Sequence, residues 1–182
     1  MILFIDTHDE LITIALKNNE ELFVKTKVSE YAHSVYTMTM IEEIFKENNL
    51  NIKDLEKIIV VNGPGSFTGI RIGLSIAKTL AYALNISINT ISSLTAYLVS
   101  NETNDNKKAV IEDNKGYYVS VFDKDNNPVV EETYCEEDTY DYPLVEEKLD
   151  IEKIIDYCKD MKSENAHFVK ANYIKKIEVE KW

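Results

Sequence analysis

Cysteine is scarce in this chain, and this scarcity limits the class of protein. Its two cysteines, Cys135 and Cys158, are too few and too far apart for a disulfide framework or a cysteine-based zinc site. We expect ordinary thiols in a reducing compartment, which favours a cytoplasmic protein.

Long hydrophobic runs are missing as well. No apolar segment approaches the roughly 20 residues that a membrane-spanning helix needs. The sequence also does not open on a basic-then-apolar leader. We therefore expect neither membrane insertion nor secretion.

Positive charge is low relative to negative charge. Lysine and arginine total 20 against 32 acidic residues, so the formal net charge is −12. This excess disfavours unaided binding to a phosphate backbone, and we expect any nucleic acid to be held only through a partner. Residues 101–150 carry 15 acidic and 5 basic side chains, a net −10. Because these acids scatter across expected turns, they indicate a solvated surface rather than a cation site.

Glycine is also rare, yet four of the five glycines fall within residues 63–73. They follow a buried strand expected over 58–61 and lead into a helix that starts near Thr68. Free N–H groups at such a helix start favour either an anion or a tightly docked backbone. The spacing fits neither the Walker phosphate loop nor the dinucleotide-binding fingerprint.

The first half of the 182 residues alternates between strands and helices. We expect strands over 2–6, 11–16, 21–28, 58–61 and 86–91, and helices over 32–48, 68–84 and from 92 or 93. Residues 101–108 contain no apolar side chain and mark a boundary, which predicts domains at 1–100 and 101–182. In the second domain we expect strands over 109–111, 117–122, 129–134 and 173–179, and a helix over 151–161.

The two long helices carry more apolar and small residues than one sheet face obviously covers. In the second helix, residues 70, 74, 77, 81 and 84 form a core-facing stripe, and Gly69, Gly73 and Ala77 form a small-residue row beside it. In the first helix, Met40 and Ile44 widen a stripe made of residues 35, 38, 41 and 45. Two interpretations stay open: a protein-binding surface, or helices packed inside their own domain.

The loop over 62–73, together with segments 2–7 and 32–34, resembles the TsaB (YeaZ) family of bacterial tRNA-modification proteins. The resemblance is looser at 111–118 and 173–176, so it is strong only to about residue 95. It implies an α/β chain with the actin/Hsp70/sugar-kinase-like (ribonuclease H-like) fold and a reduced second domain.

The resemblance further implies a non-catalytic scaffold or activator. Such proteins pair with a homologous catalytic subunit, TsaD, which places threonylcarbamoyl on N6 of the adenosine beside the tRNA anticodon, and a small ATPase, TsaE, joins the complex. Pairing uses the two helices of the first domain, and a homodimer through the same helices is a further alternative. The expected partner-binding residues are His33, Val35, Met38, Met40, Ile44, Gly69, Gly73 and Ala77.

A stand-alone ATPase or a glycoprotease-type hydrolase is the competing interpretation. The turn over 6–10 has no glycine and three carboxylates, which would repel ATP phosphates unless a metal neutralised them. His8 stands where the family usually has serine. We expect no catalytic residue, no metal site and no cofactor bound by this chain alone, with ATP or ADP at the interface of the complex as a further hypothesis.

A nucleotide-binding or partner-binding loop is nevertheless the natural hypothesis for the glycine-rich segment. Its candidate residues are Asp6, Thr7, Gly63, Gly65, Ser66, Thr68, Gly69 and Arg71. Asp6 is expected either to accept hydrogen bonds from N–H groups of its own turn or to orient a metal-bound nucleotide. Ser66 is expected to cap the helix rather than to act as a nucleophile. His33 is expected either to contact a partner or to satisfy the helix start. Arg71, the single arginine, is expected to pair with a carboxylate of its own domain or of a partner.

Overall fold

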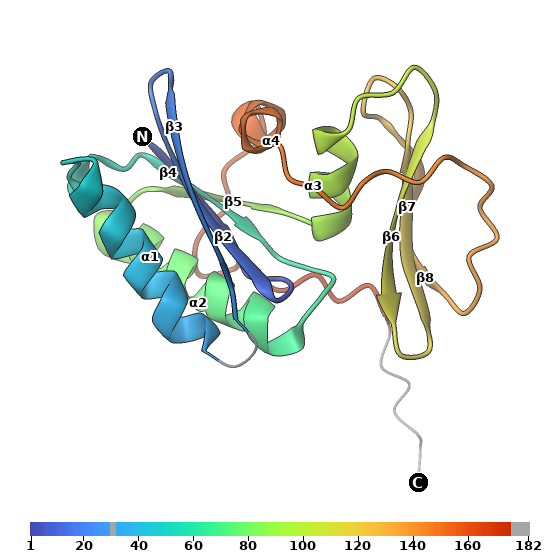
Figure 1. The fold of residues 1–182 in the computed structure, drawn as a ribbon, viewed down its shortest axis with the longest axis horizontal. Helices are drawn as coiled ribbons and strands as arrows, with labels where there is room; N and C mark the ends of the chain where they lie inside the picture. The colour runs from blue at the N-terminus through green and yellow to red at the C-terminus, as the bar shows by residue number, and fades with distance from the viewer. Residues whose placement is uncertain (30–31, 176–182) are drawn as a thin grey trace, which may run out of the picture.

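The computed structural model describes residues 1–29 and 32–175, which build two sheets with helices between and outside them (Figure 1). The larger sheet has the order β3-β2-β1-β4-β5. Its strands are β1 (Ile2–Asp6), β2 (Leu11–Asn18), β3 (Glu21–Val28), β4 (Lys57–Val61) and β5 (Ser87–Ile91). The first three form an antiparallel meander, while β4 and β5 run parallel to β1. This arrangement confirms the predicted α/β, ribonuclease H-like fold of the actin/Hsp70/sugar-kinase type.

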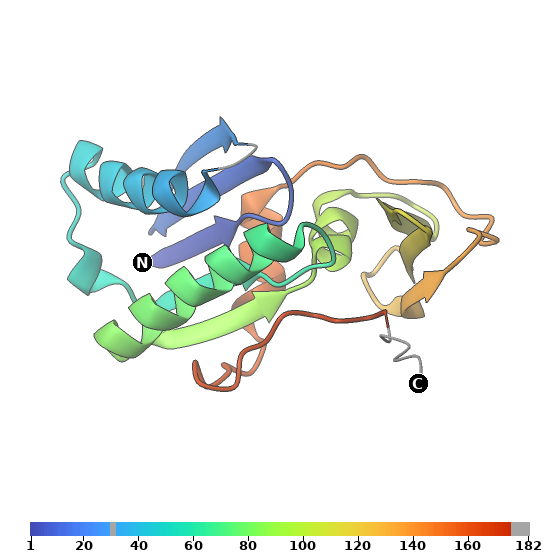
Figure 2. The same ribbon diagram turned by 90° about the horizontal axis from the view of Figure 1, so that it is seen from below.

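Two helices cover one face of the larger sheet and lie side by side, as Figure 2 shows. They are α1 (His33–Glu47) and α2 (Phe67–Leu84), and a 3-10 turn, η1 (Ile52–Asp54), follows α1. Helix α2 ends at Asn85, whose left-handed backbone (φ 53°) stops the helix. The face of α2 that carries Ile70, Leu74 and Ala77 is buried against the sheet, as its periodicity predicts.

The opposite face of the larger sheet is covered by α3 (Ser93–Ser100) and α4 (Ile151–Lys159). Helix α3 also packs on the second sheet, whose order is β6-β7-β8. Its strands are β6 (Lys107–Asp113), β7 (Gly116–Phe122) and β8 (Pro128–Cys135). The two sheets therefore share a second apolar core, with α3 between them (Figure 1).

The segment at 101–106 separates the two sheets in sequence, but the packing does not divide at residue 100. After α4 the chain returns to the larger sheet, where the Glu164 N–H donates to the Ile88 carbonyl at 2.8 Å. The Asn172 N–H donates to the Asn62 carbonyl at 2.8 Å. Val169 packs in the apolar core between the larger sheet and helices α1 and α2. Sequence patterns miss this return because it is an irregular segment held by single backbone hydrogen bonds.

The predicted ends of the chain need two corrections. Helix α4 stops at Lys159, two residues earlier than expected. The strand expected over 173–179 is absent at Tyr173–Lys175, and the rest of it lies outside the described residues. Within the part of the chain described, none of the helices combines the length and the apolar character that crossing a membrane requires.

Candidate functional site

The glycine-rich loop docks on the backbone of the turn between β1 and β2. The Ser66 N–H donates to the His8 carbonyl at 2.6 Å, and the Thr7 hydroxyl donates to the Gly69 carbonyl at 2.8 Å. A β-carbon at Gly65 or at Gly69 would overlap the carbonyl oxygen of His8 or of Thr7, respectively. Of the two roles expected for this loop, close approach of backbone to backbone is the one that the structure displays.

The start of α2 is already capped. The Ser66 hydroxyl accepts the Gly69 N–H at 3.2 Å, which is the helix-cap role expected for this serine. Thr68 is exposed in the first turn of α2, whereas Gly63 is buried with a positive φ of 103° beside Ile70. A capped helix start offers fewer free donors to a phosphate than an open one does.

Asp6 lies at the end of β1, is fully buried and holds the turn that follows. Its Oδ1 accepts the His8 backbone N–H at 3.0 Å and the His8 ring Nδ1–H at 2.7 Å. The other ring nitrogen, Nε2, lies 2.9 Å from the hydroxyl of Tyr97 on α3. Burial opposes the positive charge on His8, but Asp6, with help from Asp9 and Glu147, outweighs burial and raises the pKa of His8 above its usual value.

A cavity of about 520 Å³ opens beside this turn, between the larger sheet and the second half of the chain. Carboxylates dominate its charged lining: Asp9, Glu10, Glu112 and Glu147. Burial raises the pKa of Asp9, which shows how unfavourable further negative charge is here. Among residues 1–29 and 32–175, no three histidine, cysteine or carboxylate side chains are grouped closely enough to hold a metal ion. The carboxylates that line this cavity would repel the phosphates of ATP or ADP.

Two expected contact residues have partners within the chain itself. His33 is buried, and its Nε2 lies 2.8 Å from the Asp9 carbonyl, so it braces the β1–β2 turn rather than facing a partner. Arg71 donates to the Tyr173 hydroxyl from Nε at 3.2 Å and from Nη2 at 2.8 Å, and its guanidinium lies 3.6 Å from the Phe67 ring centroid. Within the described residues Arg71 thus contacts a tyrosine and a phenylalanine rather than a carboxylate of its own domain, and pairing with a carboxylate of a partner stays a prediction.

An apolar groove of about 470 Å³ runs between α1 and α2 on the face that points away from the sheet. Three apolar side chains at this face are strongly exposed: Val35 at 62%, Met38 at 46% and Phe67 at 59%. The groove is lined by Ser34, Met38, Phe67, Thr68, Arg71, Ile72, Ser75 and Ile76. Val35 and Met38 are thus exposed, and their contact with a partner stays a prediction.

The other predicted docking residues are buried in the chain's own core. Met40 is 5% exposed and Ile44 is 1% exposed, because both point from α1 to the larger sheet. Gly69, Gly73 and Ala77 are also buried, and the Thr7 side chain fills the space beside Gly73. The small-residue row therefore accommodates the end of β1 and not a partner helix, so these five assignments are wrong.

The α2 residues that line the groove were not predicted as contact residues, although the sequence contains a signal for them. Phe67, Ile72 and Ile76 are apolar residues of α2 that lie outside its core stripe. Tyr97 was missed for another reason, since its contact with His8 joins residues 89 positions apart. No local pattern reports such a pair.

Comparison with known proteins agrees with this architecture. YeaZ from Pseudomonas aeruginosa superposes with a TM-score of 0.83 at 16% identity, over 94% of this chain and 98% of that one. A family model described as "TsaD: tRNA N6-adenosine threonylcarbamoyltransferase" matches residues 24–165.

Curated relatives define the family more closely. The Bacillus subtilis tRNA threonylcarbamoyladenosine biosynthesis protein TsaB is 40% identical over 99 residues, which cover 51% of this chain and 41% of that protein. The Escherichia coli TsaB protein is 31% identical over 93 residues, covering 51% and 40%. The chain belongs to the matched family, within its TsaB (YeaZ) group. The aligned region spans about two fifths of the length of these relatives.

Proposed function

We propose that this chain is a non-catalytic subunit that pairs with a TsaD-like subunit and activates it in the N6-threonylcarbamoylation of the adenosine beside the tRNA anticodon. A TsaE-like ATPase joins the same complex. The names of the curated TsaB relatives support the pathway. A Bdellovibrio bacteriovorus tRNA N6-adenosine threonylcarbamoyltransferase, 35% identical over 81 residues, supports homology between the two partners.

The groove between α1 and α2 carries this proposal. Exposed Met38 and Phe67 line this concave surface together with Ile72 and Ile76, and Val35 is a further exposed apolar residue of α1. Contiguous apolar surface of this kind marks protein interaction sites, and an aromatic ring such as Phe67 is a common anchor in them. The TsaD-like subunit is the proposed occupant, and a second copy of this chain is the competing one.

The site beside Asp6 supports a role without catalysis. A catalytic serine needs a base, but within the described residues none of the three histidine rings hydrogen-bonds to the Ser66 hydroxyl, which instead caps α2. An ATPase needs its phosphates neutralised, whereas carboxylates line the adjacent cavity. These features disfavour the stand-alone ATPase and the glycoprotease-type hydrolase. A nucleotide at the interface would have to draw its positive charge from the partner or from a cation.

The charge balance supports a tRNA role only within the complex. A chain with a net charge of −12 gains little from counterion release, so the lone chain should bind tRNA too weakly to detect at physiological salt. Its contribution is to stabilise the competent conformation of the TsaD-like subunit.

Reconstitution of the transfer reaction tests the proposal. The purified chain alone should neither hydrolyse ATP nor modify tRNA, and adding it to the TsaD-like and TsaE-like proteins of the same organism should raise transfer several-fold. Turnover by the lone chain that disappears in Asp6→Ala or Ser66→Ala, with the fold of each variant verified by circular dichroism, would contradict the non-catalytic assignment. An unchanged transfer rate on addition would contradict the activator role.

A further inference from the structure

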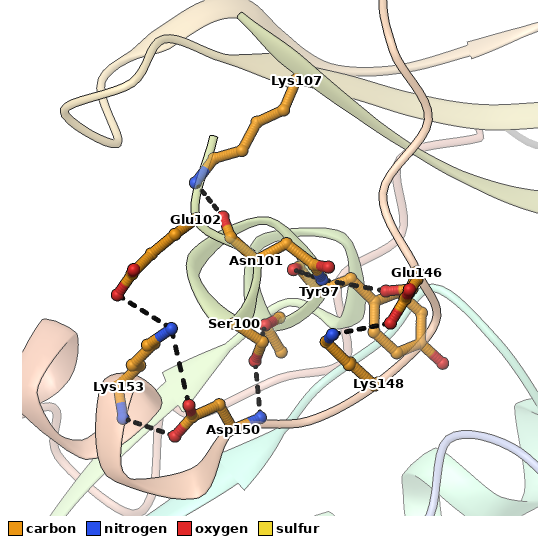
Figure 3. Close-up of polar contacts among 10 residues, drawn as sticks. Tyr97, Ser100, Asn101, Glu102, Lys107, Glu146, Lys148, Asp150 and Lys153 are labelled. Atoms are coloured by element: carbon orange, nitrogen blue, oxygen red, sulfur yellow. Dashed lines mark hydrogen bonds and ion pairs between the residues drawn. The ribbon is translucent and has the colours of Figure 1, made fainter. Parts of the chain in front are cut away.

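Helix α3 is the element through which the two sheets meet. Leu94, Tyr97 and Leu98 belong to the core between the sheets, and the helix contacts both β6 and β7. Its C-terminal end is tied to the second half of the chain (Figure 3): the Ser100 hydroxyl accepts the Asp150 N–H at 2.8 Å, and the Asn101 amide donates to the Glu146 carbonyl at 2.9 Å. Helix α3 therefore packs on the second sheet and is hydrogen-bonded to the segment before α4.

On its other side α3 reaches the β1–β2 turn through one buried polar chain. The His8 ring lies 2.7 Å from Asp6 Oδ1 through Nδ1 and 2.9 Å from the Tyr97 hydroxyl through Nε2. All three residues are at most 5% exposed, and the two rings pack edge to face with centroids 5.6 Å apart. We propose that Asp6, His8 and Tyr97 form a polar clasp that fixes α3, and the second sheet with it, against the β1–β2 turn, and that protonated His8 is the form that holds it.

The geometry explains why the clasp is stronger when the His8 ring is protonated. A neutral imidazole can donate Nδ1–H to Asp6 and accept the Tyr97 hydroxyl proton at Nε2, but it leaves the buried Asp6 carboxylate uncompensated. The second oxygen of that carboxylate, Oδ2, is buried without a hydrogen-bond partner among the described residues. A protonated imidazole donates from both nitrogens and neutralises the carboxylate.

Acidic side chains from several elements around His8 favour the same charge state, whereas burial opposes it. Four more acids line the adjacent cavity from the turn, from β6 and from the segment before α4: Asp9, Glu10, Glu112 and Glu147. His33 is the other basic group of that lining. Because the folded-state pKa of His8 is raised, the stabilisation is complete below the unfolded value of about 6.5 and is lost as the pH rises through the folded value.

Imidazole NMR tests the charge state directly. His8 signals, assigned through their absence in His8→Asn, should titrate with a midpoint above about 6.5 and show both ring nitrogens protonated below that midpoint. A midpoint at or below 6.5 would overturn the claim that the charged form holds the clasp.

Thermal unfolding tests the clasp itself. Tyr97→Phe keeps the ring but removes the hydroxyl, and should lower Tm by about 2–6 °C and speed amide exchange along α3. His8→Asn should lower Tm as well, and the double variant should lose less than the sum of the two, whereas exposed His167→Asn should change little. Additive losses would show that His8 and Tyr97 act separately and would overturn the proposal.

The pH profile of Tm gives a third measurement. Between pH 6 and 9 the wild-type Tm should fall relative to that of His8→Asn, and parallel profiles would contradict the proposed role of the charge. If His8→Asn does not fold, two measurements still test the clasp. One is the wild-type imidazole titration, with the His8 signals assigned by comparison with His33→Asn and His167→Asn. The other is amide exchange along α3 in Tyr97→Phe. None of these measurements depends on the pairing with a TsaD-like subunit.

Discussion

The Thr7 carbonyl oxygen occupies the space that a β-carbon at Gly69 would need, and the Thr7 hydroxyl donates to the Gly69 carbonyl at 2.8 Å. This contact explains why α2 tolerates a glycine near its start, where alanine would favour the helix by about 1 kcal/mol. The close approach of Thr7, directly after β1, therefore requires a glycine at this position.

Gly69→Ala should therefore destabilise the protein despite the gain in helix propensity. The new methyl group meets backbone that cannot rotate away, and we expect a loss of about 1–3 kcal/mol in urea unfolding. Gly73→Ala should cost less, because the obstructing atom there is the Thr7 hydroxyl. Exposed Ser75→Ala is the control and should stay within about 0.5 kcal/mol. Equal stability of the Gly69→Ala and Ser75→Ala variants would contradict the contact.

Truncation to alanine should affect the free energy of unfolding much more at one methionine of α1 than at the other. Met40 is 5% exposed and packs in the core, so Met40→Ala should lower the free energy of unfolding by about 2–5 kcal/mol. Met38 is 46% exposed, and Met38→Ala should change it by less than about 1 kcal/mol. Urea titration followed by circular dichroism compares them, and similar losses would show that the two faces of α1 have been misassigned.

Glu132 on β8 should anchor the segment that returns to the larger sheet. Its carboxylate accepts hydrogen bonds from Ser92, from Thr95 at 3.0 Å and from the Asn172 amide at 2.6 Å. Glu132→Ala should speed amide exchange at Asn172 and at the start of α3, whereas exposed Glu131→Ala should not. Unaltered exchange in Glu132→Ala would mean that the core holds this segment without the carboxylate.

The buried thiol should be almost inert in the folded protein. Burial raises the pKa of Cys158 to about 11, which leaves roughly one thiolate in a thousand at pH 8. With a disulfide reagent at pH 8, Cys135, which is partly exposed, should react first and Cys158 only on unfolding. Equally rapid labelling of both thiols in native buffer would show that the packing of α4 opens readily and exposes Cys158.

The sequence predicts the elements of the larger sheet and the core stripe of α2 because periodicity and the glycine cluster are local signals. It does not separate Met38 from Met40, since both fit a wide apolar stripe and only the position of the sheet decides which one is covered. The sequence also does not predict contacts between distant positions, such as His8 with Tyr97 and Arg71 with Tyr173. Those contacts depend on how α3 and the final segment pack, which no short pattern encodes.

The affinity of the chain for its TsaD-like partner tests the central claim most directly. Met38→Glu places a charge in the α1–α2 groove, and Val129→Glu places the same charge on β8 at nearly equal exposure, 46% against 45%. By isothermal titration calorimetry, Met38→Glu should weaken binding at least tenfold, while Val129→Glu should leave Kd unchanged. If Met38→Glu binds the partner as tightly as the wild-type chain does, the groove is not the docking surface and the account of pairing is wrong.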